Sequence, residues 1–295
     1  MKLKKTILKT TNQESHWVGD GFYVRSIFSY NTLGQQISPF LLMDYAAPRE
    51  FSPTQVRRGV GEHPHRGFET VTICYSGEVE HRDSAGGGGI IRAGDVQWMT
   101  AASGLVHEEF HSENFAQSGG DFEMLQLWVN LPRQFKMSPP RYQPLKAESF
   151  PQIQLSENAG LLRVIAGEYQ QRKGPALTYS PINIWDLRLN DGAQVELSVP
   201  VGHTCSLFVL AGNILSDDNC LIESAEIALF ETTKEKIRIK AKGQCKLLFL
   251  GGEPLNEPIC GYGPFVMNTP EEIRQAFSDY QQGKLGTLEK IQGSE

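Results

Sequence analysis

The sequence lacks three features that would each point to a different class of protein. It has no apolar run near the eighteen or so residues of a membrane helix, so we expect no membrane span. Its 28 Lys and Arg are outnumbered by 34 Asp and Glu, and this net charge of −6 argues against direct nucleic-acid binding. Its five cysteines include no CxxC pair, so we expect reduced thiols.

The chain also has little that resembles a targeting segment. Its first residues, MKLKKTILKTTNQESHW, are briefly basic, and their apolar run is too short for a signal peptide. Together with the reduced cysteines, this favours a cytoplasmic protein. We expect it to be a monomer.

Short apolar segments recur along most of the chain, separated by Gly, Pro, Asn and Asp. They are rich in Val, Ile, Thr and aromatic residues, which is typical of β-strands in a sandwich or barrel. Examples are FYVRSIFS, ETVTICYSGEVEH, GIIRAGDVQWMT, EMLQLWVNLP, INIWDLRL, CSLFVLAGNIL and CKLLFLGG. We therefore predict an all-β protein.

The two halves of the chain share one layout. Residues 201–215 follow the order of turn, strand, small-residue turn and strand that is also present in residues 61–80, which indicates two copies of one β-domain. Prolines interrupt the strand pattern between Phe135 and Leu145. We therefore predict domains at residues 1–135 and 136–295.

One helix is predicted near the end of the chain, in NTPEEIRQAFSDYQQGK (268–284). Thr269 can cap it and Pro270 suits its first turn. Its apolar residues recur at helical spacing on one face, namely Ile273, Ala276, Phe277 and Tyr280. The second domain should therefore end in a helix.

Five of the seven histidines lie between His63 and His111. His63 and His65 are two residues apart, so in a strand both rings point to one face, and His107 and Glu109 repeat this spacing. If the two segments pair as antiparallel neighbours, four ligand groups converge. Three imidazoles and a carboxylate suit iron, nickel, copper, zinc or manganese, whereas calcium and magnesium prefer oxygen ligands.

Strand alternation indicates which of the acidic residues and histidines in this region can be ligands. It selects Glu109 over Glu108 as the carboxylate. His111 continues the alternation but should lie at the strand end, so we expect it near the ligands or exposed. Glu69 has the parity of His65 and could be a fifth ligand, but we favour a role in orienting a histidine ring. The alternative is that these are surface histidines that make local hydrogen bonds.

Two segments resemble the motifs of the cupin superfamily. GEHPHRGFETVTICYSGEV is similar to the first motif and GDVQWMTAASGLVHEEF to the second. More narrowly, HPHRGFET, GDVQWMTA, LQLWVNLP and GPFVMNT resemble the pirins, a branch with two cupin domains, over most of the chain from residue 38 onward. The sequence departs from the general pattern, because Gly94 and His107 are two residues further apart and Thr100 replaces a proline.

The resemblance implies two tandem cupin domains of jelly-roll (double-stranded β-helix) type. It implies a mononuclear metal in the first domain, held by His63, His65, His107 and Glu109, since pirins take the carboxylate from the second motif. We expect iron(II) first, with manganese, nickel, copper or zinc as alternatives. The second domain has only His203 near the corresponding place and resembles a frame without metal ligands.

The resemblance further implies an oxidoreductase of the quercetin 2,3-dioxygenase type. Its substrates would be O2 and a small aromatic compound such as a flavonol, and Glu109 would act as the general base that takes the proton of the flavonol 3-hydroxyl. A second hypothesis is a regulator that senses metal or redox state and binds a protein partner. A sugar or keto-acid isomerase would fit the metal ligands but not the pirin motifs.

Some neighbouring residues invite other interpretations. The glycine run in SAGGGGIIRAG (84–94) lacks the following Lys-Ser/Thr and helix of a phosphate loop, so we expect the tip of a hairpin. Phe68, Trp98 and Met99 suit core packing, with pocket walls as the alternative. Arg66 can pair with Glu69 or with an anionic substrate, and the alternative is a solvated or structural arginine.

Overall fold

A computed structural model describes residues 3–288, which fold into two compact units. Within the described residues, unit 1 comprises 3–14, 26–41 and 148–256, and unit 2 comprises 15–25, 42–147 and 257–288. The chain thus changes unit at 147/148, not at the predicted 135/136. Each terminal segment also belongs to the unit that is built mainly from the other half of the chain.

Strand pairing explains this exchange of segments. The first strand, β1 (Thr6–Thr10), pairs with β21 (Ile227–Phe230) of unit 1. In the proline-rich segment that we took as a junction, β12 (Arg141–Leu145) pairs with β9 (Val96–Thr100) and belongs to unit 2. Long-range backbone pairing therefore decides the membership of both segments.

Unit 1 is built on a nine-stranded antiparallel sheet in the order β1-β21-β19-β22-β17-β14-β13, with β18 beside β22 and β20 beside β19. Its strands are β1 and β21, given above, and β13 (Gln152–Leu155), β14 (Gly160–Ala166), β17 (Ile182–Leu189), β18 (Gln194–Ser198), β19 (Thr204–Ser216), β20 (Leu221–Ile222) and β22 (Lys236–Gly252). A small hairpin joins β15 (Glu168–Tyr169) and β16 (Arg172–Lys173). Its interior is apolar, with the rings of Trp185 and Phe249 stacked at 4.3 Å.

Unit 2 contains most of a seven-stranded sheet, β12-β9-β6-β11-β4-β3-β2, and a four-stranded sheet, β5-β10-β7-β8. The strands are β2 (His16–Val18), β3 (Phe22–Ser29), β4 (Phe40–Phe51), β5 (Gly59–His65), β6 (Phe68–Ser76), β7 (Glu78–Asp83), β8 (Gly88–Arg92), β10 (Leu105–His111) and β11 (Gly120–Asn130), together with β9 and β12. The unit limits at 25/26 and 41/42 fall inside β3 and β4. The glycine run lies at the tip of the β7–β8 hairpin, as predicted.

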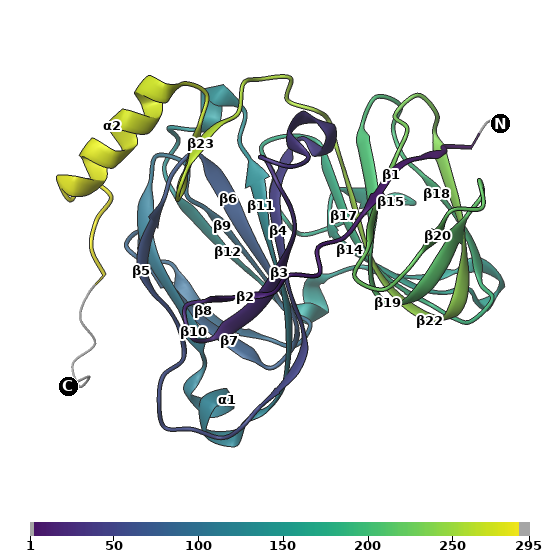
Figure 1. The fold of residues 1–295 in the computed structure, drawn as a ribbon, viewed down its shortest axis with the longest axis horizontal. Helices are drawn as coiled ribbons and strands as arrows, with labels where there is room; N and C mark the ends of the chain where they lie inside the picture. Colours follow the sequence, from purple (N-terminus) through teal and green to yellow (C-terminus); the bar gives the residue numbers. More distant parts are fainter. Residues whose placement is uncertain (1–2, 289–295) are drawn as a thin grey trace. The chain divides into compact units, whose positions relative to one another are not determined.

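The all-β prediction with a C-terminal helix is confirmed. Helix α2 (Pro270–Gln281) begins with a capping box between Thr269 and Glu272, and it follows the hairpin of β23 (Cys260–Tyr262) and β24 (Phe265–Met267) (Figure 1). The prediction did not include the short helix α1 (Glu113–Ser118), which Ser112 caps. Short 3-10 helices are also present at Gly34–Ile37, Arg133–Phe135, Ala147–Ser149 and Ser156–Asn158.

Two further predictions concern the cysteines and membrane-spanning helices. The five cysteines form no disulfide within the described residues, and Cys74, Cys205 and Cys245 are buried. Within residues 3–288, neither α1 nor α2 has the length and apolar character needed to cross a membrane.

Candidate metal centre

Two antiparallel strands of unit 2 bring three of the predicted ligands together. Strand β10 pairs with β5 so that His107 lies opposite His63 and Leu105 opposite His65. The ring centroids are 4.2 Å apart for His63 and His107, 4.8 Å for His65 and His107, and 4.9 Å for His63 and His65. One ring nitrogen of each histidine lies within 4.8 Å of the others, so the three can share one ion.

Hydrogen bonds show which ring nitrogen keeps its lone pair in His63 and in His65. Nδ1 of His63 lies 2.8 Å from the Gly61 carbonyl, and Nδ1 of His65 lies 3.1 Å from the Pro264 carbonyl. A carbonyl oxygen can only accept, so both rings carry their proton on Nδ1 and keep the Nε2 lone pair. Nε2 of His107 is buried and has no hydrogen-bond partner in residues 3–288. Two imidazole nitrogens with free lone pairs, and a third ring nitrogen that no hydrogen bond occupies, fit a transition-metal ion.

The charge state of the rings is also the one that metal binding requires. Burial, reinforced by the neighbouring His63, lowers the pKa of His65 to about 3. Burial and the same neighbour lower the pKa of the fully buried His107 well below its usual range. Both imidazoles are therefore neutral near pH 7, as metal ligands must be.

Glu109 lies in a second group that shares His107 with the first. Its carboxylate, one nitrogen of His107 and one of His81 lie within 4.8 Å of one another, and all three residues are buried. Glu109 Oε1 accepts hydrogen bonds from Thr72 Oγ1 and Gln97 Nε2, both at 3.4 Å. The β5–β10 register shifts between His107 and Glu109. The two-residue spacing therefore does not keep Glu109 beside His63 and His65, and its role as fourth ligand stays a prediction.

Glu108 points away from this group, as strand alternation predicts. Its Oε1 accepts from Arg82 at 2.5 Å and from Arg57 at 3.1 Å. These ion pairs occupy the carboxylate on the opposite face of β10. Glu108 is therefore a structural residue.

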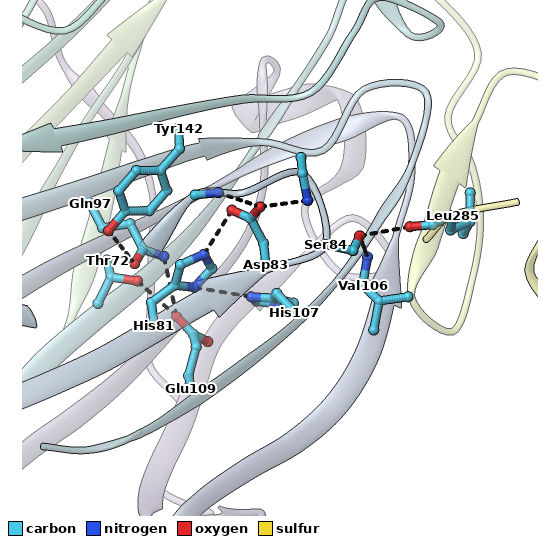
Figure 2. Close-up of polar contacts among 12 residues, drawn as sticks. Thr72, His81, Asp83, Ser84, Gln97, Val106, His107, Glu109, Tyr142 and Leu285 are labelled. Carbon is cyan, nitrogen blue, oxygen red and sulfur yellow. Dashed lines mark hydrogen bonds and ion pairs between the residues drawn. The ribbon is translucent and has the colours of Figure 1, made fainter. Parts of the chain in front are cut away.

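His81, for which no role was predicted from the sequence, lies next to His107 (Figure 2). Its Nδ1 lies 3.4 Å from Nδ1 of His107, and its Nε2 lies 3.2 Å from Asp83 Oδ2. Its ring stacks on Tyr142 at 5.1 Å with an angle of 11° between planes. The signal in the sequence was the alternation in GEVEHRD, which puts His81 and Asp83 on one face of β7.

The expectation that His111 lies near the ligands or exposed is wrong. Only 2% of His111 is exposed, and its Nε2 lies 2.9 Å from the Gly21 carbonyl. Its ring centroid lies 4.7 to 5.6 Å from those of Phe22, Phe51, Phe115 and Phe122. The face of β10 that carries His107 continues into an aromatic core, and His111 is part of that core.

The expectation that Glu69 orients a histidine ring is also wrong. Strand β5 ends at His65, Gly67 has a φ of +90°, and β6 begins at Phe68, so the alternation starts anew after this turn. Phe68 lies against His65 at 5.0 Å, and Glu69 points to the other face of β6. There Glu69 accepts from Thr100 at 2.6 Å, and burial raises the pKa of Glu69 to about 7.

The neighbouring residues contribute to packing. Arg66 pairs with Asp279 of α2 at 2.8 Å and donates to the Ser103 carbonyl, rather than pairing with Glu69. Trp98 and Met99 are fully buried. Phe68 packs on Trp128 at 4.3 Å, and Trp128 lies 5.3 Å from His65. An aromatic pair thus covers one side of the histidine cluster.

Known proteins with similar sequences and structures cover nearly the whole chain. The model of the Pirin family matches residues 21–129, and that of the Pirin C-terminal cupin domain matches residues 184–286. A Pseudomonas aeruginosa protein named putative quercetin 2,3-dioxygenase is 56% identical over 96% of this chain and 99% of its own. A tomato (Solanum lycopersicum) pirin-like protein is 37% identical over 96% of this chain and 92% of its own.

Solved structures agree in fold. The crystal structure of a quercetin 2,3-dioxygenase from Acinetobacter baumannii has a TM-score of 0.95 and 53% identity, covering 98% of this chain and 100% of that one. A bacterial pirin from Escherichia coli in complex with nickel(II) has a TM-score of 0.62 and 19% identity, over 84% of this chain and 99% of that one. The predicted architecture of two cupin domains is confirmed.

Proposed function

The chain belongs to the pirin family of two-domain cupins, and from this premise we propose that it is a metal-dependent dioxygenase that cleaves flavonols such as quercetin with O2. The observation that carries the proposal is the convergence of three imidazoles, from His63, His65 and His107, of which the last two are buried and neutral near pH 7. Its similarity to proteins named quercetin 2,3-dioxygenase supports the reaction class.

We assign His63, His65, His107 and Glu109 as the ligands of one divalent transition metal. Iron(II) is our first choice, and manganese, nickel, copper and zinc are alternatives. Such an ion, when bound, supplies a Lewis acid that makes a coordinated flavonol hydroxyl more acidic, and iron adds redox chemistry with O2.

The chain's own residues supply the proton acceptor. A carboxylate near the ligands can take the proton of the flavonol 3-hydroxyl, and Glu109 is the carboxylate in the second group of the cluster. Its hydrogen bonds from Thr72 and Gln97 are long, 3.4 Å each, so they orient the carboxylate without saturating it. Glu109 therefore acts as general base in this proposal.

Other residues control access to the cluster. His63 is half-buried, whereas His65 and His107 are 4% and 0% exposed, so substrate reaches the cluster past His63. Phe68 and Trp128 cover His65 on another side with apolar surface. Such a wall excludes bulk water from a reaction that needs a reactive anion.

The test joins metal analysis to an assay. The metal content of the purified protein is measured, the protein is loaded separately with iron, manganese, nickel or copper, and the loss of quercetin absorbance is followed in air and under nitrogen. We expect oxygen-dependent loss that rises in proportion to bound metal. A stoichiometric metal with no turnover under any loading contradicts the proposal.

That negative result would favour the second candidate, a metal-sensing protein that binds a partner. One observation supports it. In unit 2, the guanidinium of Arg49 lies 5.2 Å from the ring centre of Trp17 and 4.7 Å from that of Tyr23, and these rings are 46% and 36% exposed. Exposed Trp, Tyr and Arg are the residues most enriched at binding hot spots.

A further inference from the structure

The proton position on His107 is not determined by its own contact. His63 and His65 each donate Nδ1–H to a carbonyl oxygen, which leaves no choice. Nδ1 of His107 instead faces Nδ1 of His81 at 3.4 Å. A neutral imidazole nitrogen can donate or accept, so either ring could hold the proton between them.

Asp83 removes this ambiguity (Figure 2). Its Oδ2 lies 3.2 Å from Nε2 of His81, and an ionised carboxylate can only accept. The proton of a neutral His81 must then be on Nε2, which leaves a lone pair on its Nδ1. That lone pair accepts from Nδ1–H of His107, and the lone pair of His107 is therefore on Nε2. With one proton on each ring, this chain of hydrogen bonds is complete without an extra charge.

The glycine run of the β7–β8 hairpin holds Asp83 in place. Oδ1 of Asp83 accepts from the backbone N–H of Ala85 and of Gly87, both at 2.9 Å. A Cβ at Gly87 would clash with Asp83 Oδ2 and with the side chain of Tyr142. The turn therefore needs a residue without a side chain at position 87 to close around the carboxylate.

The same contacts keep Asp83 ionised. Burial raises the pKa of Asp83, but hydrogen bonds from His81 and the Gly87 amide outweigh burial and hold that pKa below its usual value. On the other side, the stacked ring of Tyr142 holds the plane of His81. His81 is thus fixed by a carboxylate at one edge and an aromatic ring on one face.

We propose that Asp83 and His81 are positioning residues that hold the proton of His107 on Nδ1 and so present its Nε2 to a metal shared with His63 and His65. This inference rests on the proposed metal centre and assigns a role to two residues outside it. Hydrogen-bonded partners behind a ligating histidine commonly orient the ring and set its tautomer. This chain of hydrogen bonds begins in the glycine-rich β7–β8 hairpin, where two backbone amides hold the carboxylate of Asp83.

The competing arrangement uses His81 as a ligand. His81, His107 and Glu109 form the second group with ligand atoms within 4.8 Å. Because Nδ1 is the nitrogen of His107 that faces His81, a metal between these two rings would take the Nδ1 lone pair of His107. The proton of His107 would then be on Nε2. The two arrangements therefore predict opposite tautomers for one residue.

Nitrogen-15 NMR of the metal-free full chain, labelled in its histidines, distinguishes these tautomers. At a pH where the rings are neutral, we expect His107 protonated on Nδ1 and His81 on Nε2. In Asp83→Asn, the amide oxygen still accepts from Ala85 and Gly87, and the amide N–H faces His81. This donor should reverse both tautomers and weaken binding of iron(II) or zinc about 10- to 100-fold.

Asp95→Asn is the matched control. Asp95 is 6% exposed, like Asp83, and accepts from the backbone N–H of Arg92 and Ala147, but it contacts Lys146 instead of a histidine. Its substitution should leave the tautomers and the metal affinity unchanged.

The wild-type spectrum decides the question even if Asp83→Asn does not fold. A proton on Nε2 of His107 in the wild-type protein would overturn the proposal, and so would unchanged tautomers in a folded Asp83→Asn variant. Metal titration and quercetin turnover test the proposed function separately. If the wild-type protein shows the expected tautomers but binds no metal, the proposed metal centre is contradicted. The assignment of the protons to Nδ1 of His107 and Nε2 of His81 would still hold.

Discussion

Histidines of one strand differ in role because their hydrogen bonds and neighbours differ. His107 and His111 lie on the same face of β10, yet His107 has a buried Nε2 without a partner and His111 uses its Nε2 on the Gly21 carbonyl. Alternation along the strand predicted the face correctly. It could not predict that four phenylalanine rings surround His111, because two of them, Phe22 and Phe51, come from segments sixty or more residues away in the sequence.

His63 is the ligand whose removal should disturb the fold least, because it is half-buried. We expect His63→Ala to bind iron(II) or zinc at least tenfold more weakly, since a direct ligand matters at least as much as the partners behind it. The melting temperature should change by less than about 4 °C, which corresponds to roughly 1 kcal/mol. Elemental analysis and thermal unfolding measure the two effects.

His16→Ala is the control for this substitution, because His16 is exposed on β2. It should keep both the metal and the melting temperature. Full metal retention in His63→Ala would remove His63 from the ligand set.

Glu109 can be tested separately from the histidines. Glu109→Gln keeps a similar shape but cannot take the hydroxyl proton, so we expect turnover of quercetin to fall about 10²- to 10⁴-fold while part of the metal remains. Glu108→Gln is the matched control, because its carboxylate faces Arg82 and Arg57 on the other side of β10. Turnover at the wild-type rate in Glu109→Gln would exclude Glu109 as the base.

Glu69 should make the stability of the protein depend on pH. Burial raises the pKa of Glu69 to about 7 from an ordinary value of 4.5, so the folded state holds a proton that the unfolded state releases between these values. The contribution is fully present below pH 4.5 and is lost as the pH rises through 7. The full change is about 3 kcal/mol, at 1.36 kcal/mol for each pH unit.

Denaturant unfolding at several pH values checks this sign. Relative to Glu69→Gln, which cannot titrate, the wild-type protein should lose stability between pH 4.5 and 7. A difference between the two proteins that stays constant over this range would show that Glu69 does not titrate as described.

At the scale of elements, local patterns predicted single strands and the helix better than the connections between them. Helix α2 was predicted because its signals are local: Thr269 caps it, Pro270 starts it, and its apolar residues recur at helical spacing. The turn at Gly67 was not anticipated. Gly67 has a positive φ, and a Cβ there would also clash with the Val266 carbonyl, almost two hundred residues away, so no local pattern contains that contact.

Helix α2 is tied to the strands of the metal centre by a buried ion pair. Asp279→Asn would leave the guanidinium of Arg66, which is 4% exposed, without a carboxylate, and we expect a loss of about 3 kcal/mol. Hydrogen exchange of the α2 amides measures this loss. The hydrogen bond from Arg66 lowers the pKa of Asp279, so the effect should persist at neutral pH and fade in acid.

Glu271→Gln removes an exposed ion pair with Arg274 on the same helix and serves as the control. It should change the exchange of α2 little, because exposed pairs contribute little. Equal exchange in the Asp279→Asn variant and the wild-type protein would show that the ion pair does not hold the helix.

At the scale of the whole molecule, the two units share an architecture and differ in what fills their interiors. The interior of unit 1 is packed with apolar side chains such as Leu187, Leu207 and Leu247, whereas unit 2 carries a histidine cluster on the paired strands β5 and β10. The repeated strand pattern was sufficient to predict two β-domains. It was insufficient to predict to which unit each terminal segment belongs. The pairing of Thr6 with Phe230, for example, joins residues more than two hundred positions apart in the sequence.

The central claim is that a metal at His63, His65 and His107 drives oxygen-dependent cleavage of a flavonol. The most direct measurement is mass spectrometry of the products formed from quercetin under ¹⁸O2, with the metal-loaded wild-type protein and His107→Ala side by side. We predict that the wild-type products carry both labelled oxygen atoms and that His107→Ala forms them only at the background rate. Labelled products at equal rates from both proteins, or none from either, would contradict the account.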